Sequence, residues 1–258
     1  MANQNFENNL QSVYQIPFDV IELPSKGILY PNKIDRVKVE YLVGNDENIL
    51  TSINLINNGQ VFDVLLQRKV KDLPFRTDEL LIGDRNAILI WLRATAYGAK
   101  YPVKVTDPNT GEELDGEMDL TKLKPKYLEF QPDENGLFTF TLPVSGKVVK
   151  FKLLTVRDER ELLQTSELKI KKGGSVSTLL TDRLTRIIKS IDGNTDGIHI
   201  MNEVGVMLAG DSLALRKFYE KVEPGYESKI DIETPSGGVV NSFFRIGPDF
   251  FYPDLRIS

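Results

Sequence analysis

The chain has 258 residues, of which 41% are hydrophobic and 27% charged, a balance typical of a protein that folds around a core. It has no cysteine and one histidine, His199, which excludes disulfides, thiolate chemistry and metal sites built from several histidines. The net charge of −5 gives no reason to expect nucleic-acid or membrane binding. No apolar run is long enough to span a bilayer, and the polar first ten residues do not predict export. We therefore expect proteins as partners.

The N-terminal half begins with an expected arm, residues 1–19, which is polar at first and more apolar from residue 13 to 18. A Leu-Pro turn follows at residues 23–27. Residues 37–41 alternate between apolar and charged side chains, and this period of two predicts a half-buried strand. Asn45 or Asp46 is placed to cap a following helix. The apolar face of that helix carries Ile49, Leu50, Ile53 and Ile56.

A longer apolar helix is predicted over residues 85–97, opened by Asp84 and ended by Gly98. Two strands follow, residues 101–106 and 112–118, and the turn between them contains Pro108 and Gly111. Proline fixes φ early in such a turn and glycine supplies positive φ late in it, so these residues predict a β-hairpin. The polar segment 131–136 is the natural joint between two halves.

The same order of features returns in the second half. It has a Leu-Pro turn at 142–146, an alternating strand at 149–153 and a helix opened by Thr155. A helix opened by Asp211 and a hairpin of residues 229–233 and 239–246 complete it. At an offset of 112 residues, six residues of 37–50 are identical to their counterparts in 149–162. At an offset of 127 residues, Gly83-Asp84 corresponds to Gly210-Asp211. We infer an α+β protein of two internally duplicated units, residues 20–130 and 137–258.

No sequence pattern makes a convincing catalytic or metal site. The glycines at 173–174 lack the Gly-Lys-Ser/Thr ending of a phosphate loop. His199 is expected to cap or pack a helix, and Asp158 and Glu159 are explained by the helix N-terminus that they occupy. Residues 192–196 are similar to a calcium loop, but the oxygen ligands downstream are missing. We predict no catalytic residue, no cofactor and no metal.

Aromatic side chains favour contact with another protein at two places. The C-terminal segment packs five aromatics into ten residues. They either fill the core of the second unit, which we favour, or form a tail that docks in a groove of a neighbour, because aromatics are enriched in interface hot spots. The apolar end of the arm offers the same contact. The predicted partner-binding residues are Tyr14, Ile16 and Phe18 from the arm and Phe250, Phe251 and Tyr252 from the tail.

An ordered set of short motifs spans nearly the whole chain. The motifs are ELPSKGILYP at 22–31, DENIL at 46–50, LIGDR at 81–85, WLRATAYG at 91–98, IDG at 191–193, Asp211 with Leu215-Arg216, and FFYP at 250–253. This set resembles the baseplate and hub-assembly proteins of T4-like bacteriophages. Similar proteins often carry paired cysteines in the hairpin turns, whereas the turns 107–111 and 234–238 have none. No metal role is carried over, and the family has no catalytic residues to transfer.

The resemblance implies a structural component of a contractile phage tail baseplate, in the hub region, that acts through contacts with other baseplate and hub proteins. It would assemble in the host cytoplasm and reside in the virion, and a homo-oligomer within the baseplate is left open. One alternative is a hub assembly chaperone that is absent from the finished particle. Another is a hydrolase with an acidic site, which the sequence disfavours because it shows no nucleophile–base pair.

Overall fold

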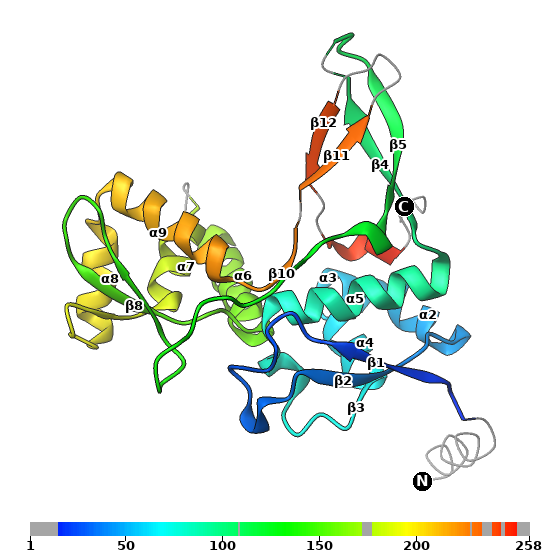
Figure 1. Ribbon diagram of the computed structural model, residues 1–258, viewed down its shortest axis with the longest axis horizontal. Coiled ribbons are helices and arrows are strands. Elements are labelled where there is room, and N and C mark those ends of the chain that lie inside the picture. Colours follow the sequence, from blue (N-terminus) through cyan, green and yellow to red (C-terminus); the bar gives the residue numbers. More distant parts are fainter. Residues whose placement is uncertain are drawn as a thin grey trace.

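The computed structural model describes residues 15–107, 109–171, 177–227, 229–233, 239–243 and 246–251. It is an α+β protein, as predicted, with several small antiparallel sheets (Figure 1). The described residues form the helices α2 (Gly44–Leu50), α3 (Ile53–Asn57), α4 (Val61–Lys69), α5 (Ile82–Tyr97), α6 (Val156–Lys171), α7 (Leu179–Ile187), α8 (Gly197–Gly205) and α9 (Ala209–Val222). The strands are β1 (Phe18–Glu22), β2 (Arg36–Glu40), β3 (Val70–Lys71), β4 (Lys100–Thr106), β5 (Glu113–Asp119), β6 (Pro125–Lys126), β7 (Phe138–Thr141), β8 (Val148–Phe151), β9 (Ile188–Ile191), β10 (Gly225–Tyr226), β11 (Lys229–Glu233) and β12 (Val239–Phe243).

Two three-stranded antiparallel sheets lie toward opposite ends of the molecule, in the order β1-β2-β3 and β7-β8-β9 (Figure 1). The alternation predicted for each middle strand is confirmed. Val37 and Val39 of β2 are buried, as are Val149 and Phe151 of β8, while the charged residues between them are more exposed. The side chains that alternate toward the core form one continuous hydrophobic cluster with α4, α5, α7 and α9.

Most predicted helices are present, but the first is interrupted. The segment expected as one helix is α2 and α3, separated by Thr51 and Ser52. Its first turn also differs from the prediction, because Val43 is the N-cap and Asp46 accepts a hydrogen bond from the Val43 N–H at 2.8 Å. In the second half the prediction is confirmed, since Thr155 and Asp158 exchange hydrogen bonds at the start of α6.

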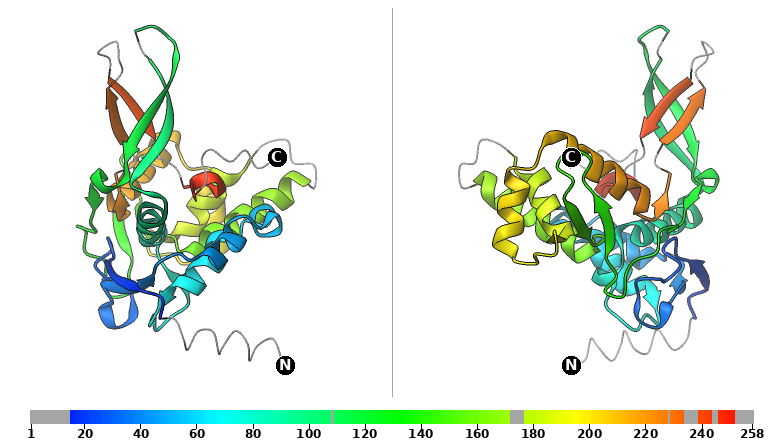
Figure 2. Two further views of the ribbon diagram at one scale, coloured as in Figure 1. Left: turned by 90° about the vertical axis from the view of Figure 1, so that its right-hand side faces the viewer. Right: turned by 60° about the vertical axis from the view of Figure 1, so that its left-hand side comes forward.

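The two hairpins, β4–β5 and β11–β12, project together from the helical body as a stalk (Figure 2). Each hairpin follows the long helix of its own half, β4–β5 after α5 and β11–β12 after α9. Because the two hairpins lie side by side, β11 and β12 of the second half contact β4 and β5 of the first half. The short 3₁₀ helix η4 (Pro248–Phe251) then packs against α5. The boundary near residue 131 therefore separates the halves along the sequence but not in space.

Equivalent buried contacts recur in the two halves. Asp84 of α5 accepts hydrogen bonds from the Ser25 N–H in the first Leu-Pro turn, at 2.9 Å, and from the Tyr30 hydroxyl, at 2.6 Å. Asp211 of α9 accepts from Val144 and Ser145 N–H in the second Leu-Pro turn, at 2.7 and 3.1 Å. Within each half, the Leu-Pro turn is therefore hydrogen-bonded to the aspartate of the Gly-Asp helix start.

A second pair of contacts repeats in the same way. Asp46 at the start of α2 binds Arg68 at the end of α4, with 2.8 Å between carboxylate oxygen and Nε. Asp158 at the start of α6 lies 3.8 Å from the Nε of Arg186 at the end of α7. An internal duplication would preserve such pairs, and the duplication itself stays a prediction.

The start of α5 is pressed against the backbone that enters β10. A Cβ atom added to Gly83 would lie 1.8 Å from the Pro224 carbonyl oxygen. We expect Gly83→Ala to lower the free energy of unfolding by about 1–3 kcal/mol, because backbone must move to relieve the overlap. Urea unfolding at equilibrium measures the loss. Gly210→Ala is the matched control at the corresponding position of α9, where the added Cβ would meet only a Val144 methyl at 3.1 Å. Equal stability of the two variants would contradict the expected clash.

Candidate interaction surface

The structure describes four of the six predicted partner-binding residues, since Tyr14 and Tyr252 lie outside the described residues. Ile16 precedes β1 and is partly buried. Phe18 is the first residue of β1 and 49% exposed, with the Lys38 ammonium 3.9 Å from the centre of its ring. The arm as predicted therefore overlaps a strand, and Phe18 is displayed on the surface of a sheet.

Phe250 and Phe251 are buried, at 0% and 1% exposed. The centroid of the Phe250 ring lies 5.4 Å from that of Tyr101. The centroid of the Phe251 ring lies 6.1 Å from that of Phe62 and 6.4 Å from that of Tyr97. They fill the core, as the favoured interpretation held, but the core of the first half rather than of the second. In this conformation a partner cannot contact either side chain.

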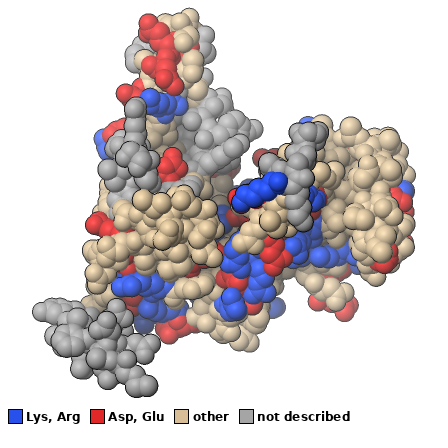
Figure 3. All heavy atoms as spheres, turned by 180° about the vertical axis from the view of Figure 1, so that it is seen from behind, with Lys and Arg blue, Asp and Glu red and all other residues tan. Residues whose placement is uncertain are grey.

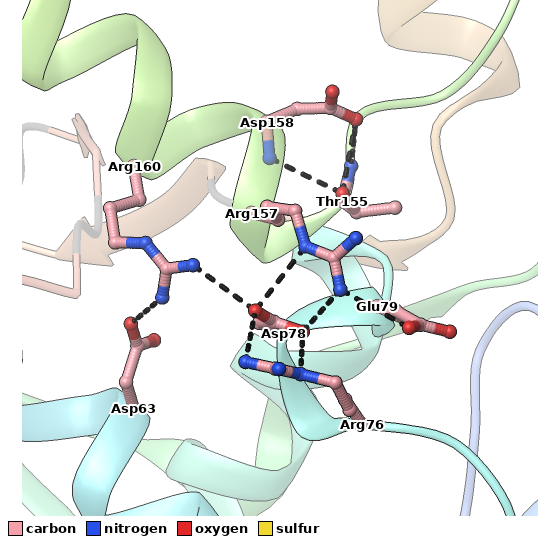
Figure 4. Close-up of polar contacts among 8 residues, drawn as sticks. All are labelled: Asp63, Arg76, Asp78, Glu79, Thr155, Arg157, Asp158 and Arg160. Carbon is pink, nitrogen blue, oxygen red and sulfur yellow. Dashed lines mark hydrogen bonds and ion pairs between the residues drawn. The ribbon is translucent and has the colours of Figure 1, made fainter.

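The two halves are joined by a cluster of ion pairs centred on Asp78, in the 3₁₀ helix η2 (Thr77–Glu79) (Figure 4). Asp78 is 3% exposed and accepts hydrogen bonds from Arg76 of its own segment and from Arg157 and Arg160 of α6. Arg157 also reaches Glu79 at 3.1 Å, and Arg160 reaches Asp63 of α4 at 2.6 Å. Arginine suits this site because its planar guanidinium binds two carboxylates at once.

The charge balance of this cluster indicates a structural role. Hydrogen bonds from Arg157 and then from Arg160 and Arg76 hold the pKa of Asp78 well below its usual range, although its burial opposes this. A carboxyl group kept ionised by three arginines has no proton to donate and is a poor base. The cluster therefore fixes α6 on the first half and sets the relative position of the two halves.

A groove between α7 and α9 holds Glu223, a carboxyl group with a perturbed pKa. Burial raises the pKa of Glu223, which accepts a hydrogen bond from the Tyr219 hydroxyl at 3.3 Å and lies in the same groove as Arg183. Burial also raises the pKa of Asp84, but Asp84 is bonded to the turn at Ser25 and lines no cavity with Glu223. Two carboxyl groups with raised pKa values therefore do not meet in this groove, and its geometry does not favour acid–base hydrolysis.

The most unusual surface lies at the end of the second half, around α8. Ile200 and Val204 face the core, but apolar side chains also cover the outer side of this region. We call this the α8 surface. It consists of Val144, Ile198, Met201, Val206, Leu208 and Leu213.

Two parts of the α8 surface, the α8–α9 connection and the β7–β8 turn, adjoin each other. Val206, Leu208 and Ser145 line one small cavity, which places the α8–α9 connection beside the β7–β8 turn. Ile198 is 68% exposed and Val206 77%. Seen from behind, this end of the molecule shows few charged side chains, whereas basic (blue) and acidic (red) side chains gather over the junction between the two halves (Figure 3). Contiguous apolar surface of this kind marks interaction sites in soluble proteins.

Sequence analysis did not identify the α8 surface, although one signal was present. Between residues 197 and 210 the sequence GIHIMNEVGVMLAG contains Glu203 and no other Asp, Glu, Lys or Arg. A short helix that is apolar on both sides cannot bury all of its apolar residues at the edge of a domain. Asp196 caps this helix by accepting from the His199 N–H at 2.7 Å. The helix expected at His199 is therefore present, but its cap is Asp196 rather than His199, and its outward face was missed.

Comparison with known proteins gives no match, because no family model, no curated protein and no solved structure matches this chain. Within the described ranges, no group of three or more His, Cys, Asp or Glu residues is arranged to hold a metal ion. None of the helices in the described part of the chain has the length and apolar character needed to cross a membrane.

Proposed function

We propose that this chain is a structural component of a contractile phage tail baseplate, in the hub region, held in place by contacts with other baseplate proteins. The ordered motifs from residue 22 to residue 253 support the phage assignment. The α8 surface is the observation that carries an interaction function, because its large apolar side chains stay in water in the folded chain and would gain the free energy of burial only when a partner covers them.

The chemistry of the α8 surface fits a protein partner better than a small molecule. It is formed by a helix and turns with only a small cavity beside Val206 and Leu208, and Met201 offers an adaptable side chain of the kind enriched at protein interfaces. The ion pairs around Asp78 hold this surface in a fixed position relative to the first half. A preorganised apolar patch loses little conformational freedom when a partner covers it.

The proposal predicts that charge on the α8 surface blocks incorporation into the tail. We expect the double variant Met201→Glu, Val206→Glu to fold normally but to fall about tenfold or more in copies per particle, as would follow from roughly 1.4 kcal/mol of lost contact energy. Quantitative mass spectrometry of purified particles and of the infected-cell lysate gives both amounts. Ile53→Glu is the matched control, an equally exposed apolar residue at 60% on α3.

Each outcome has a distinct meaning. A fixed copy number of the wild-type chain per particle, lost only in the α8 variant, supports the structural role. Wild-type chain that is abundant in lysate and absent from particles overturns it in favour of the assembly chaperone. Equal incorporation of the α8 variant and the control would reject the α8 surface as the contact.

A further inference from the structure

β1 is an edge strand, and no strand of the described part of the chain pairs with its outer side. It is first in the order β1-β2-β3, and four of its five residues are exposed. In antiparallel sheets, successive residues direct their backbone groups alternately toward and away from a given neighbour. The Leu23 N–H donates to Asp35 and the Tyr41 N–H donates to the Pro17 carbonyl, so odd-numbered residues of β1 face β2. The N–H and C=O groups of Phe18, Val20 and Glu22 therefore point away from the sheet.

This edge is short and carries Asp19 and Glu22, but it lacks three other features that usually protect an edge strand. Natural edges are interrupted by proline, lysine or a β-bulge, because an unpaired ladder binds other strands. The strand FDVIE contains none of these, and its register with β2 is unbroken from Phe18 to Glu22. The open side ends at Pro24, whose carbonyl accepts a hydrogen bond from the Leu128 N–H. Within the described residues, the outward backbone groups that lack a strand partner at this edge are therefore those of β1 itself.

The corresponding edge of the other sheet provides an internal comparison. The Leu142 N–H donates to Lys147, so the residues of β7 whose backbone groups face outward are Thr139 and Thr141. Both are exposed and polar. On β1, the same kind of position carries Phe18 at 49% and Val20 at 59% exposed. An apolar pair on an open edge favours strand pairing, whereas a threonine pair is compatible with water.

We propose that β1 pairs antiparallel with β1 of a second copy of this chain, about a twofold axis at Val20. In this register Val20 lies opposite Val20 of the second copy and Phe18 lies opposite its Glu22. These are the three residues whose backbone groups point outward, so every outward group meets a complementary one. No like charges become directly opposite, since Asp19 lies opposite Ile21. The two sheets would join into one continuous sheet across the dimer.

The contact between the two copies is short, so the dimer should be weak. A single five-residue strand from each copy buries less than the roughly 1,200 Å² of standard interfaces, which places the dissociation constant in about the micromolar range or weaker. This inference concerns the isolated chain and does not rest on the proposed baseplate function. It adds a defined homotypic contact at the opposite half of the molecule from the α8 surface.

Charge exchange at Val20 tests the twofold axis directly. The variants Val20→Glu and Val20→Lys each place like charges opposite each other in the dimer, and we expect each alone to be monomeric in sedimentation equilibrium across roughly 5–500 μM, the range in which the wild-type chain associates. Their equimolar mixture should recover dimers, because glutamate then lies opposite lysine. Val20→Ile is the control, since it keeps an apolar β-branched side chain and the N–H and should dimerise like wild type.

The mixture also guards against misfolding, since recovery requires both variants to be folded. A wild-type chain that is monomeric over the whole range would overturn the proposal. A mixture that stays monomeric while the wild type dimerises, or single variants that dimerise normally, would place the interface elsewhere and overturn it equally. Thermal unfolding followed by circular dichroism confirms that each variant alone is native.

Discussion

Replacing Phe250 or Phe251 with alanine should lower the free energy of unfolding by about 3–5 kcal/mol each, the range for deleting a buried aromatic side chain. Both side chains are enclosed by aromatic residues of the first half, with Tyr101 beside Phe250 and Phe62 beside Phe251. Their removal leaves a cavity that η4 cannot fill alone. Urea unfolding followed by fluorescence and by circular dichroism measures the loss. The stability losses from the two substitutions should not be additive, because the two rings are in contact, with 5.4 Å between their centroids.

The matched control is Phe18→Ala, which removes an aromatic side chain that is half exposed on β1. Its expected effect is within about 0.5 kcal/mol, as for surface substitutions in general. A partner-docking tail would give the reverse pattern for Phe250, with unchanged stability of the isolated chain and a loss seen only in the presence of a partner. That result would show that the burial of the C-terminal aromatics is not maintained in solution.

Local structure could be predicted well from this sequence, because its signals are local. The alternation in β2 and β8 reports a sheet with one buried face, and Gly98, with φ of +90°, ends α5 where the sequence predicted. Two exceptions were the N-cap of α2 and the break between α2 and α3. A continuous apolar stripe gives no sign of a break of one or two residues, and helix ends are set by contacts as much as by propensity.

The placement of segments relative to each other could not be predicted in the same way. Aromatics at positions 250 and 251 are apolar in either half, and nothing local specifies that they pack on α5 rather than on α9. The cluster around Asp78 joins residues that are up to 97 positions apart in the sequence. Each of its members reads as an ordinary surface charge, and only the fold brings the carboxylates and the arginines together.

The paired motifs were an intermediate case. Matching Leu-Pro turns and matching Gly-Asp helix starts were visible in the sequence, but their direct bonding to each other was not. The structure gives this similarity a physical basis, since each buried aspartate accepts hydrogen bonds from backbone N–H groups of the neighbouring Leu-Pro turn. Similarity that lies at mutually bonded positions is more informative about common architecture than the same number of scattered matches.

Replacing Asp78 with asparagine should weaken the junction between the halves and lower the free energy of unfolding by about 3 kcal/mol, the lower end of the range for breaking a buried ion pair. The value is at the lower end because Arg157 and Arg160 keep some contact with solvent, at 41% and 27% exposed. Asparagine keeps the volume but removes the charge that both guanidinium groups share. Urea unfolding at pH 7 measures the loss, and Arg76→Ala is the control, since Arg76 is 71% exposed.

The pH dependence identifies the carboxylate as the cause. Because the arginines hold the pKa of Asp78 below its unfolded value, its ionised form stabilises the native chain above about pH 4, and this stabilisation is lost as the pH falls toward the folded pKa. The stability difference between wild type and Asp78→Asn should therefore be largest near neutral pH and shrink steadily below about pH 4. Acids outside this cluster titrate in both proteins and cancel in the difference. A difference that is constant from pH 7 to pH 2 would mean that asparagine disturbs packing rather than charge, and the cluster would then not be the electrostatic joint between the halves.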